Sequence, residues 1–149
     1  MDVKKAIENR RSLRGLKKIE ITDDIINELV NSAKLAPSCF NKQPWKFIFV
    51  RSEDQMNNMR SVMSKGNEWT YNSSCIIAVI SKKEFDCVIK EREYYLFDVG
   101  ISVGQLMLRA TELDLVTHPI AGFSPSKARE VLSIPEDWDV ITLIPLGKR

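Results

Sequence analysis

The sequence has few of the residues from which metal centres and hydrolytic sites are built. Its 149 residues include one histidine, His118, and three cysteines, Cys39, Cys75 and Cys87. The cysteines are odd in number and form no C-x-x-C pair, so no zinc ligand set can be assembled from them. A single histidine without a G-x-S-x-G turn argues against a Ser-His-Asp hydrolase. We therefore expect three reduced cysteines in a cytoplasmic protein.

Signals for nucleotide cradles, membranes and secretion are also lacking. The sequence contains neither a Walker loop nor G-x-G-x-x-G. Its longest wholly apolar run, Cys75 to Ile80, is far shorter than a membrane span. The charged opening, Met1 to Lys5, is not followed by an apolar segment, so no secretory signal is expected.

Charge is nearly balanced overall but uneven along the chain. A net charge of +2 argues against a general nucleic-acid binder, which usually needs a broad basic excess. Residues 1–18 nevertheless contain seven basic and two acidic side chains, a local balance of +5. This asymmetry indicates a focused anion site.

Length and apolar spacing predict one α+β domain over residues 1–149. Helices are expected from Val3 to about Arg10, after a Thr22 cap to Ala33, after a Ser52 cap through Met63, from about 93 to 113, and, after a Ser124 cap, from Pro125 to Leu132. Strands are expected at WKFIFV (45–50), CIIAVI (75–80), the start of LVTHPIAGF (115–123) and DVITLIPLG (139–147). The unalternating apolar strand at 45–50 implies cover on both faces.

The helix expected over 93–113 is apolar around most of its circumference. It must be covered on more than one side, either inside the domain or at a subunit interface. Gly100 and Gly104 would allow another backbone to approach closely, although they could also ease local packing.

Two polar stretches carry the candidate chemistry. In NRRSLR (9–14), arginine offers a planar fork of donors that matches phosphate, and serine adds a neutral bond. In APSCFNKQPW (36–45), a stiff loop presents Ser38, Asn41 and Gln43 to a flat heterocycle. Taken alone, the arginine cluster could equally be a solvated helix end, a localisation signal or a nucleic-acid phosphate contact.

The two stretches, in this order and followed by HPIAGF (118–123), resemble the nitroreductase family of flavin enzymes. The similarity runs from about Ala6 to Gly147. It implies a central, mostly antiparallel sheet flanked by helices, with the long apolar helix at a homodimer interface that holds two FMN sites. It also implies NADH or NADPH as electron donor and ping-pong reduction of a small-molecule electron acceptor such as a nitroaromatic or a quinone. Neither nucleic acid nor membrane is an expected partner.

The resemblance also implies which residues contact FMN. The phosphate and the ring's carbonyl edge would be met by Arg10, Arg11, Ser12 and Arg14. The partner subunit would contribute Pro37, Ser38, Cys39 and Asn41 to the ring, with Gln43 supporting that loop. The reactive nitrogen would lie along Pro119, Ile120, Ala121 and Gly122. Many members bind the phosphate with a further basic residue, for which Lys148 and Arg149 are the candidates.

Other interpretations stay open beside this one. No catalytic side chain is expected, because the flavin carries the chemistry, and His118 is interpreted as a structural or pocket-lining residue. Cys39 is interpreted as a small side chain, with a redox thiol as the alternative. Asn67 and Asn72 are candidates for a further cofactor contact. The same scaffold could instead serve a flavin-binding module with little turnover, or a specialised reaction such as reductive removal of a ring substituent.

Overall fold

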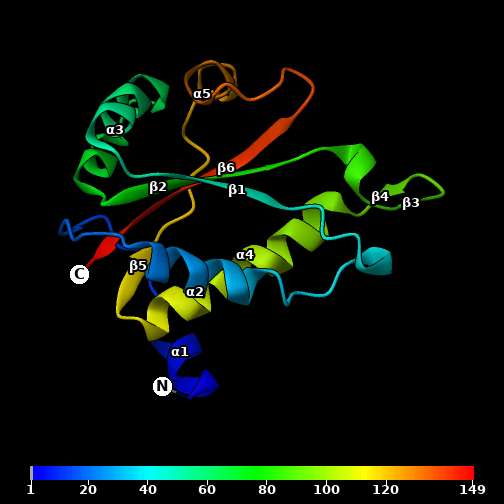
Figure 1. The fold of residues 1–149 in the computed structure, drawn as a ribbon, viewed down its shortest axis with the longest axis horizontal. Helices are drawn as coiled ribbons and strands as arrows, with labels where there is room; N and C mark the ends of the chain where they lie inside the picture. Colours follow the sequence, from blue (N-terminus) through cyan, green and yellow to red (C-terminus); the bar gives the residue numbers. More distant parts are fainter. Residues whose placement is uncertain (1) are drawn as a thin grey trace.

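The computed structural model describes residues 2–149 as helices packed on both sides of an antiparallel sheet (Figure 1). The α-helices of this part of the chain are α1 (Val3–Asn9), α2 (Asp23–Ala33), α3 (Glu53–Met59), α4 (Tyr95–Glu112) and α5 (Pro125–Leu132). The main sheet has the order β1-β2-β6-β5, formed by β1 (Lys46–Val50), β2 (Cys75–Ser81), β5 (Leu115–Thr117) and β6 (Asp139–Lys148). A separate hairpin pairs β3 (Val88–Ile89) with β4 (Arg92–Glu93). The predicted α+β class and antiparallel sheet are confirmed.

Strand β2 lies between the two main layers of side chains. Successive residues of a strand point to opposite faces of the sheet. Ile77 accordingly lies in the core cluster shared with α2 and α4, and Ala78 lies in the cluster that contains α3 and α5 residues. All seven residues of β2 are buried, as its unbroken apolar sequence predicted.

The predicted cover on both faces of β1 is also found, although β1 is an edge strand. Phe47 and Phe49 pack against the cluster of α2 and α4, and Ile48 packs against the opposite cluster. These three side chains stay half-buried because β1 has only one neighbour in the sheet.

Helix starts follow the predicted side-chain caps. The hydroxyl of Thr22 accepts from Ile25 N at 3.3 Å, and Ser52 and Ser124 cap α3 and α5 in the same way. The helix predicted to carry Met63 is shorter than expected. Helix α3 ends at Met59, the 3-10 turn Arg60–Val62 follows, and Met63 forms an isolated bridge with Phe123.

No helix within residues 2–149 combines the length and the apolar character that crossing a bilayer requires.

Replacing Ile77 by alanine should lower the free energy of unfolding by about 2–5 kcal/mol, because the side chain is fully buried and its loss leaves a cavity. Val88→Ala on the exposed hairpin is the control and should change it by less than about 0.5 kcal/mol. Urea unfolding followed by circular dichroism measures both. Equal effects of the two substitutions would contradict the two-sided burial of β2.

Candidate functional site

The arginine-rich segment begins where α1 ends. Arg10 leaves helical geometry, with φ −59° and ψ 122°, while its N–H still donates to Ala6 O at 3.1 Å. The Arg11 guanidinium donates to Glu8 O at 2.6 Å and to Arg10 O at 2.7 Å. Arg10 Nη1 donates to Ser12 Oγ at 3.4 Å. Hydrogen bonds from the Arg10 and Arg11 side chains to neighbouring residues thus stabilise the turn that carries the guanidinium groups.

Two aromatic rings connect this segment to the rest of the fold. The rings of Trp69 and His118 stack with centroids 4.6 Å apart. The Arg14 guanidinium lies over the Trp69 ring at 5.9 Å, and His118 Nδ1 is 3.2 Å from Leu13 O. These contacts bring residues 13–14, 69 and 118 together, although they come from three distant parts of the sequence.

Asn67 fastens the loop that follows His118. Its amide donates to Gly122 O at 2.8 Å, and its Oδ1 accepts from Trp69 Nε1 at 3.1 Å. A Cβ at position 122 would lie 2.2 Å from Asn67 Nδ2, so this contact requires glycine. Asn67 and Asn72, the two candidates for a further cofactor contact, differ in their surroundings. Asn67 bonds to the loop after His118, whereas Asn72 is exposed at the end of a 3-10 turn.

The four residues predicted along the flavin, 119–122, differ in exposure. Ile120 is buried in the core cluster below α3 and α5, and its backbone N–H donates to Leu143 O at 2.9 Å. Pro119 and Gly122 are partly exposed, and Ala121 is exposed. The side chain of Ile120 therefore anchors the loop, while the other three residues face outward.

The last two residues lie near the arginine segment. Lys148 pairs with Lys17 through backbone hydrogen bonds of 2.8 and 3.1 Å, and its ammonium is 3.2 Å from the Asp114 carboxylate. Arg149 lines a pocket of about 320 Å³ together with Arg11 and Thr111. Of the two predicted phosphate contacts, Lys148 already has an acidic partner and Arg149 shares its pocket with Arg11.

The second predicted segment forms a tight loop after α2. Phe40, Asn41 and Gln43 all have positive φ, between 50° and 54°, a conformation that non-glycine residues adopt at a cost of about 1–2 kcal/mol each. Ser38 Oγ accepts from Gln43 N at 2.9 Å, and the Gln43 amide donates to Asn41 Oδ1 at 3.0 Å. Pro37, at the start of the loop, is exposed. The polar side chains of the loop thus bond within the loop itself, Gln43 to the Asn41 side chain and Ser38 to the Gln43 backbone.

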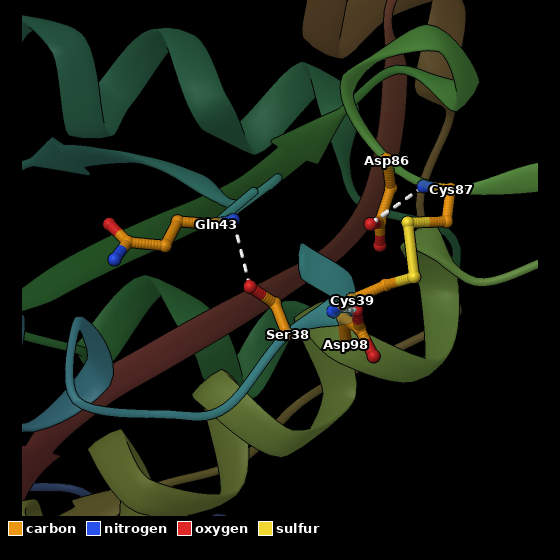
Figure 2. Close-up of a disulfide and its surroundings, with 6 residues drawn as sticks. All are labelled: Ser38, Cys39, Gln43, Asp86, Cys87 and Asp98. Atoms are coloured by element: carbon orange, nitrogen blue, oxygen red, sulfur yellow. Dashed lines mark hydrogen bonds between the residues drawn. A yellow bond between two sulfur atoms is a disulfide. The ribbon is translucent and has the colours of Figure 1, made fainter. Parts of the chain in front are cut away.

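Cys39 in this loop forms a disulfide with Cys87, with a Cα–Cα distance of 6.0 Å (Figure 2). The expectation of three reduced cysteines, with Cys39 as a small side chain, was therefore wrong. Only Cys75 is free among the described cysteines. Burial raises the pKa of the Cys75 thiol to about 12. The error arose because 48 residues separate the bonded cysteines, and no local spacing reveals such a pair.

The two predicted segments of one chain lie at opposite ends of α4. Cys39 N donates to the carboxylate of Asp98, in the first turn of α4, at 2.7 Å. Thr111, in the last turn, lines the pocket of Arg11. At 1.5 Å per residue these two helix positions are roughly 20 Å apart. In Figure 1 the loop after α2 and the segment after α1 likewise lie well apart.

The sequence and the fold are both similar to those of known proteins. The sequence model of the nitroreductase family matches residues 7–68 and 61–148. The chain belongs to the nitroreductase family. A protein of Archaeoglobus fulgidus, provisionally named an NADH dehydrogenase/NAD(P)H nitroreductase, is 28% identical over 96% of this chain and 83% of its own length.

Solved structures of the nitroreductase family agree with this assignment. A family protein of Clostridium novyi NT superimposes with a TM-score of 0.92 at 30% identity, over 99% of this chain and 85% of the other. A protein of Exiguobacterium sibiricum 255-15, provisionally named a nitroreductase and solved in complex with FMN, gives a TM-score of 0.86 at 23% identity, over 99% and 88%.

Several contacts of this nitroreductase-family site could not be expected from single residues. Trp69 contacts both the Arg14 guanidinium and the His118 ring, which no local sequence pattern indicated. Asp98 is a buried acid in the first turn of a largely apolar helix, and its position there was the available signal. Cys87 gave no signal at all.

Asn67→Ala should lower the free energy of unfolding by about 1–3 kcal/mol, because it leaves Gly122 O and Trp69 Nε1 without their partners. Asn72→Ala, in the same turn but exposed, is the matched control and should stay within about 0.5 kcal/mol. Urea titration followed by tryptophan fluorescence checks this. A loss of the same size in both variants would show that Asn67 does not fasten the loop of this nitroreductase-family chain.

Proposed function

We propose that this chain is an FMN-dependent oxidoreductase that takes electrons from NADH or NADPH and passes them to nitroaromatics, quinones or similar electron-poor compounds in a ping-pong cycle. The observation that carries the proposal is the pair of donor-rich segments, 10–14 and 38–43, at opposite ends of α4 in a chain of the nitroreductase family. The FMN complex of the Exiguobacterium sibiricum relative supports the choice of cofactor.

The donors of segment 10–14 fit a phosphate monoester. Arg10, Arg11 and Arg14 are permanently charged, and within residues 2–149 no carboxylate forms an ion pair with them. A guanidinium without an acidic partner is suited to a phosphate, because its planar fork matches two of the oxygens. Exposed Ser12 adds a neutral donor.

The loop after His118 fits a flat ring system. Ala121 is exposed and has only a methyl side chain, so a planar group can approach the backbone there, while the missing side chain of Gly122 leaves room for the Asn67 amide. The Asn67 amide holds the Gly122 carbonyl, and buried Ile120 anchors the loop to the sheet. A rigid, nearly side-chain-free surface beside the arginines therefore supports placement of the ring there.

Two subunits would complete each site. In an isologous dimer, two α4 helices that pack antiparallel bring the first turn of one beside the last turn of the other. This arrangement places loop 37–43 of one subunit near the arginine segment of its partner. It explains why one chain holds the two halves roughly 20 Å apart.

The outer face of α4 supports such a pairing. Phe97 is 65% exposed, and Gly100 and Gly104 follow on the same face, where an added Cβ would meet nothing within 4 Å. Glycine inside an exposed helix costs about 1 kcal/mol relative to alanine, without any gain in a single chain. Close contact with a second helix offsets this cost. Leu35 and Phe40 extend the apolar surface, with exposures of 76% and 86%.

The residues of the site position and stabilise rather than transfer protons. When bound, FMN supplies the two-electron transfer that side chains lack. The arginines would hold the phosphate and, at the carbonyl edge, would offset negative charge on the ring. His118, stacked on Trp69 and directed at Leu13 O, supports the site as a structural residue.

The absorption spectrum of the purified protein tests the proposal. We expect bound FMN, or a flavin band that shifts on titration with FMN, and anaerobic bleaching of that band by NADH or NADPH. A protein that binds no FMN would overturn the proposal. Binding without bleaching by either nucleotide would favour the flavin module with little turnover. Bleaching without turnover of nitroaromatics or quinones would favour a specialised reductive reaction.

Arg10→Ala should raise the Kd for FMN at least about tenfold, because a charge-assisted hydrogen bond to phosphate is lost. Its effect on the free energy of unfolding should stay within about 0.5 kcal/mol, since the side chain makes one long bond to Ser12. Arg60→Ala, which removes a guanidinium stacked on Tyr71, is the matched control and should leave the Kd unchanged. Fluorescence quenching of FMN measures both, and equal affinities would remove Arg10 from the site.

Gly104→Glu should convert a dimer into monomers that bind FMN poorly, because the new side chain occupies the contact between the two α4 helices. In a chain that is monomeric anyway, the substitution meets open space and should leave mass and stability unaltered. Asn57→Glu on exposed α3 is the control for the added charge. Sedimentation velocity decides. A wild-type monomer, or an unaffected dimer in the Gly104 variant, would refute this interface.

A further inference from the structure

Loop 38–43 needs outside support to keep its conformation. Three of its residues adopt left-handed backbone geometry, and none of them is glycine. Such geometry persists where the surrounding structure over-determines it. The bonds among Ser38, Asn41 and Gln43 lie within the loop, so they cannot fix its position on the protein.

Two tethers from outside the loop meet at one residue. The Cys39 sulfur is bonded to Cys87, and the Cys39 N–H donates to Asp98 Oδ2 at 2.7 Å. Figure 2 shows Cys87 to one side of Cys39, Ser38 and Gln43 to the other, and Asp98 next to Cys39 itself. The disulfide links the loop to the segment before the β3–β4 hairpin, and the hydrogen bond links it to α4.

Two buried acids flank the disulfide. Asp98 and Asp86 are 3% and 5% exposed. Asp98 accepts from the backbone of Cys39, and Asp86 Oδ1 accepts from the backbone of Cys87 at 2.8 Å. Burial raises the pKa of Asp86, and the neighbouring Asp98 adds to this rise. The backbone N–H of each bonded cysteine thus donates to one buried carboxylate, Cys39 to Asp98 and Cys87 to Asp86.

We propose that Cys87 and Asp98 are positioning residues for the flavin: they hold Cys39, and through it loop 38–43, in the conformation that receives the FMN of the partner subunit. Neither residue contacts the cofactor itself. The inference rests on the proposed function, because it assigns the loop to the FMN site. It makes FMN affinity depend on whether Cys39 and Cys87 are oxidised or reduced.

Reduction by a dithiol removes one of the two tethers in a balanced exchange. A thiolate of the dithiol attacks one sulfur of the Cys39–Cys87 bond, forms a mixed disulfide and releases the other cysteine. The second thiol of the reagent then closes the reagent's own disulfide and releases the remaining cysteine. Two electrons and two protons pass from the dithiol to the protein, which ends with two thiols.

Thiol counting establishes the starting state. In the folded, oxidised protein an aromatic disulfide reagent should find no reactive thiol, because Cys75 is fully buried. After treatment with dithiothreitol and its removal, two thiols should react. Two reactive thiols before treatment would show that the pair is not bonded in the isolated protein, and would overturn the proposal.

FMN titration then measures the effect of the tether. Reduction of the wild-type protein should raise the Kd for FMN at least about fivefold, because a loosened loop must be ordered on binding. Cys87→Ser lacks the disulfide, so its Kd for FMN should be raised both with and without dithiothreitol. A further change of its Kd on adding dithiothreitol would reveal an effect of the reagent elsewhere. Thermal unfolding of each sample confirms that it is folded. An unchanged Kd in both reduced protein and variant would overturn the proposal.

Asp98 is tested by a pair of substitutions. Asp98→Ala removes the acceptor for Cys39 N and should raise the Kd for FMN, whereas Asp98→Asn retains an acceptor oxygen and should restore at least half of the lost affinity. Equal losses in the two variants would contradict positioning through this bond.

Hydrogen exchange separates this inference from the proposed function. Amides of residues 39–43 should exchange faster in reduced protein and in Cys87→Ser without any flavin present, while those of β2 stay protected. If the protein binds no FMN but this difference is seen, the proposed function fails and the tether stands. If exchange is equal in all samples, the tether fails whatever the cofactor.

Discussion

The two-sided burial of β2 is the constraint on which the rest of the fold depends. The strand has antiparallel neighbours on both edges and side-chain layers on both faces, so all seven of its residues are buried. A slip of one residue would exchange the side chains of the two layers, which fixes the register with β1 and β6. With the sheet fixed, α2 and α4 are held on one face and α3 and α5 on the other (Figure 1).

Helix α4, packed on that core, sets the distance between the two candidate segments, loop 38–43 and residues 10–14. One side of the helix supplies Val99, Val103 and Leu106 to the core, and an exposed side carries Gly100 and Gly104, where an added Cβ would meet no neighbouring part of residues 2–149 within 4 Å. Its first turn holds the loop of Cys39, and its last turn lies by the pocket of Arg11. A helix of fixed rise therefore sets the distance between the two candidate halves more firmly than the loops could.

Much of this was predictable from local sequence, because local rules decide it. The caps at Thr22, Ser52 and Ser124 and the buried run CIIAVI each act within a few residues, and all were found as predicted. The strands β3 and β4 were not predicted, because two residues are too few to show an alternation of apolar and polar side chains.

The sequence predicted the segments of the candidate site but not the contacts that hold those segments in place. Residues 10–14, 37–43 and 119–122 were recognised through their order along the chain. Their supports were not, because Asn67, Cys87 and Asp98 act over sequence separations of 48 to 59 residues. Contacts at such separation depend on tertiary packing, which no local pattern encodes.

The strand order of the sheet also bears on how the chain assembles during synthesis. Strands β1 and β2 follow each other and pair directly, with only α3 and its turns between them. Strand β5 has a single strand neighbour, β6, which is made later, after α5. Until β6 is made, one edge of β2 and the whole of β5 lack partners, so closure of the sheet waits for the last of its strands and exposed edges persist until then.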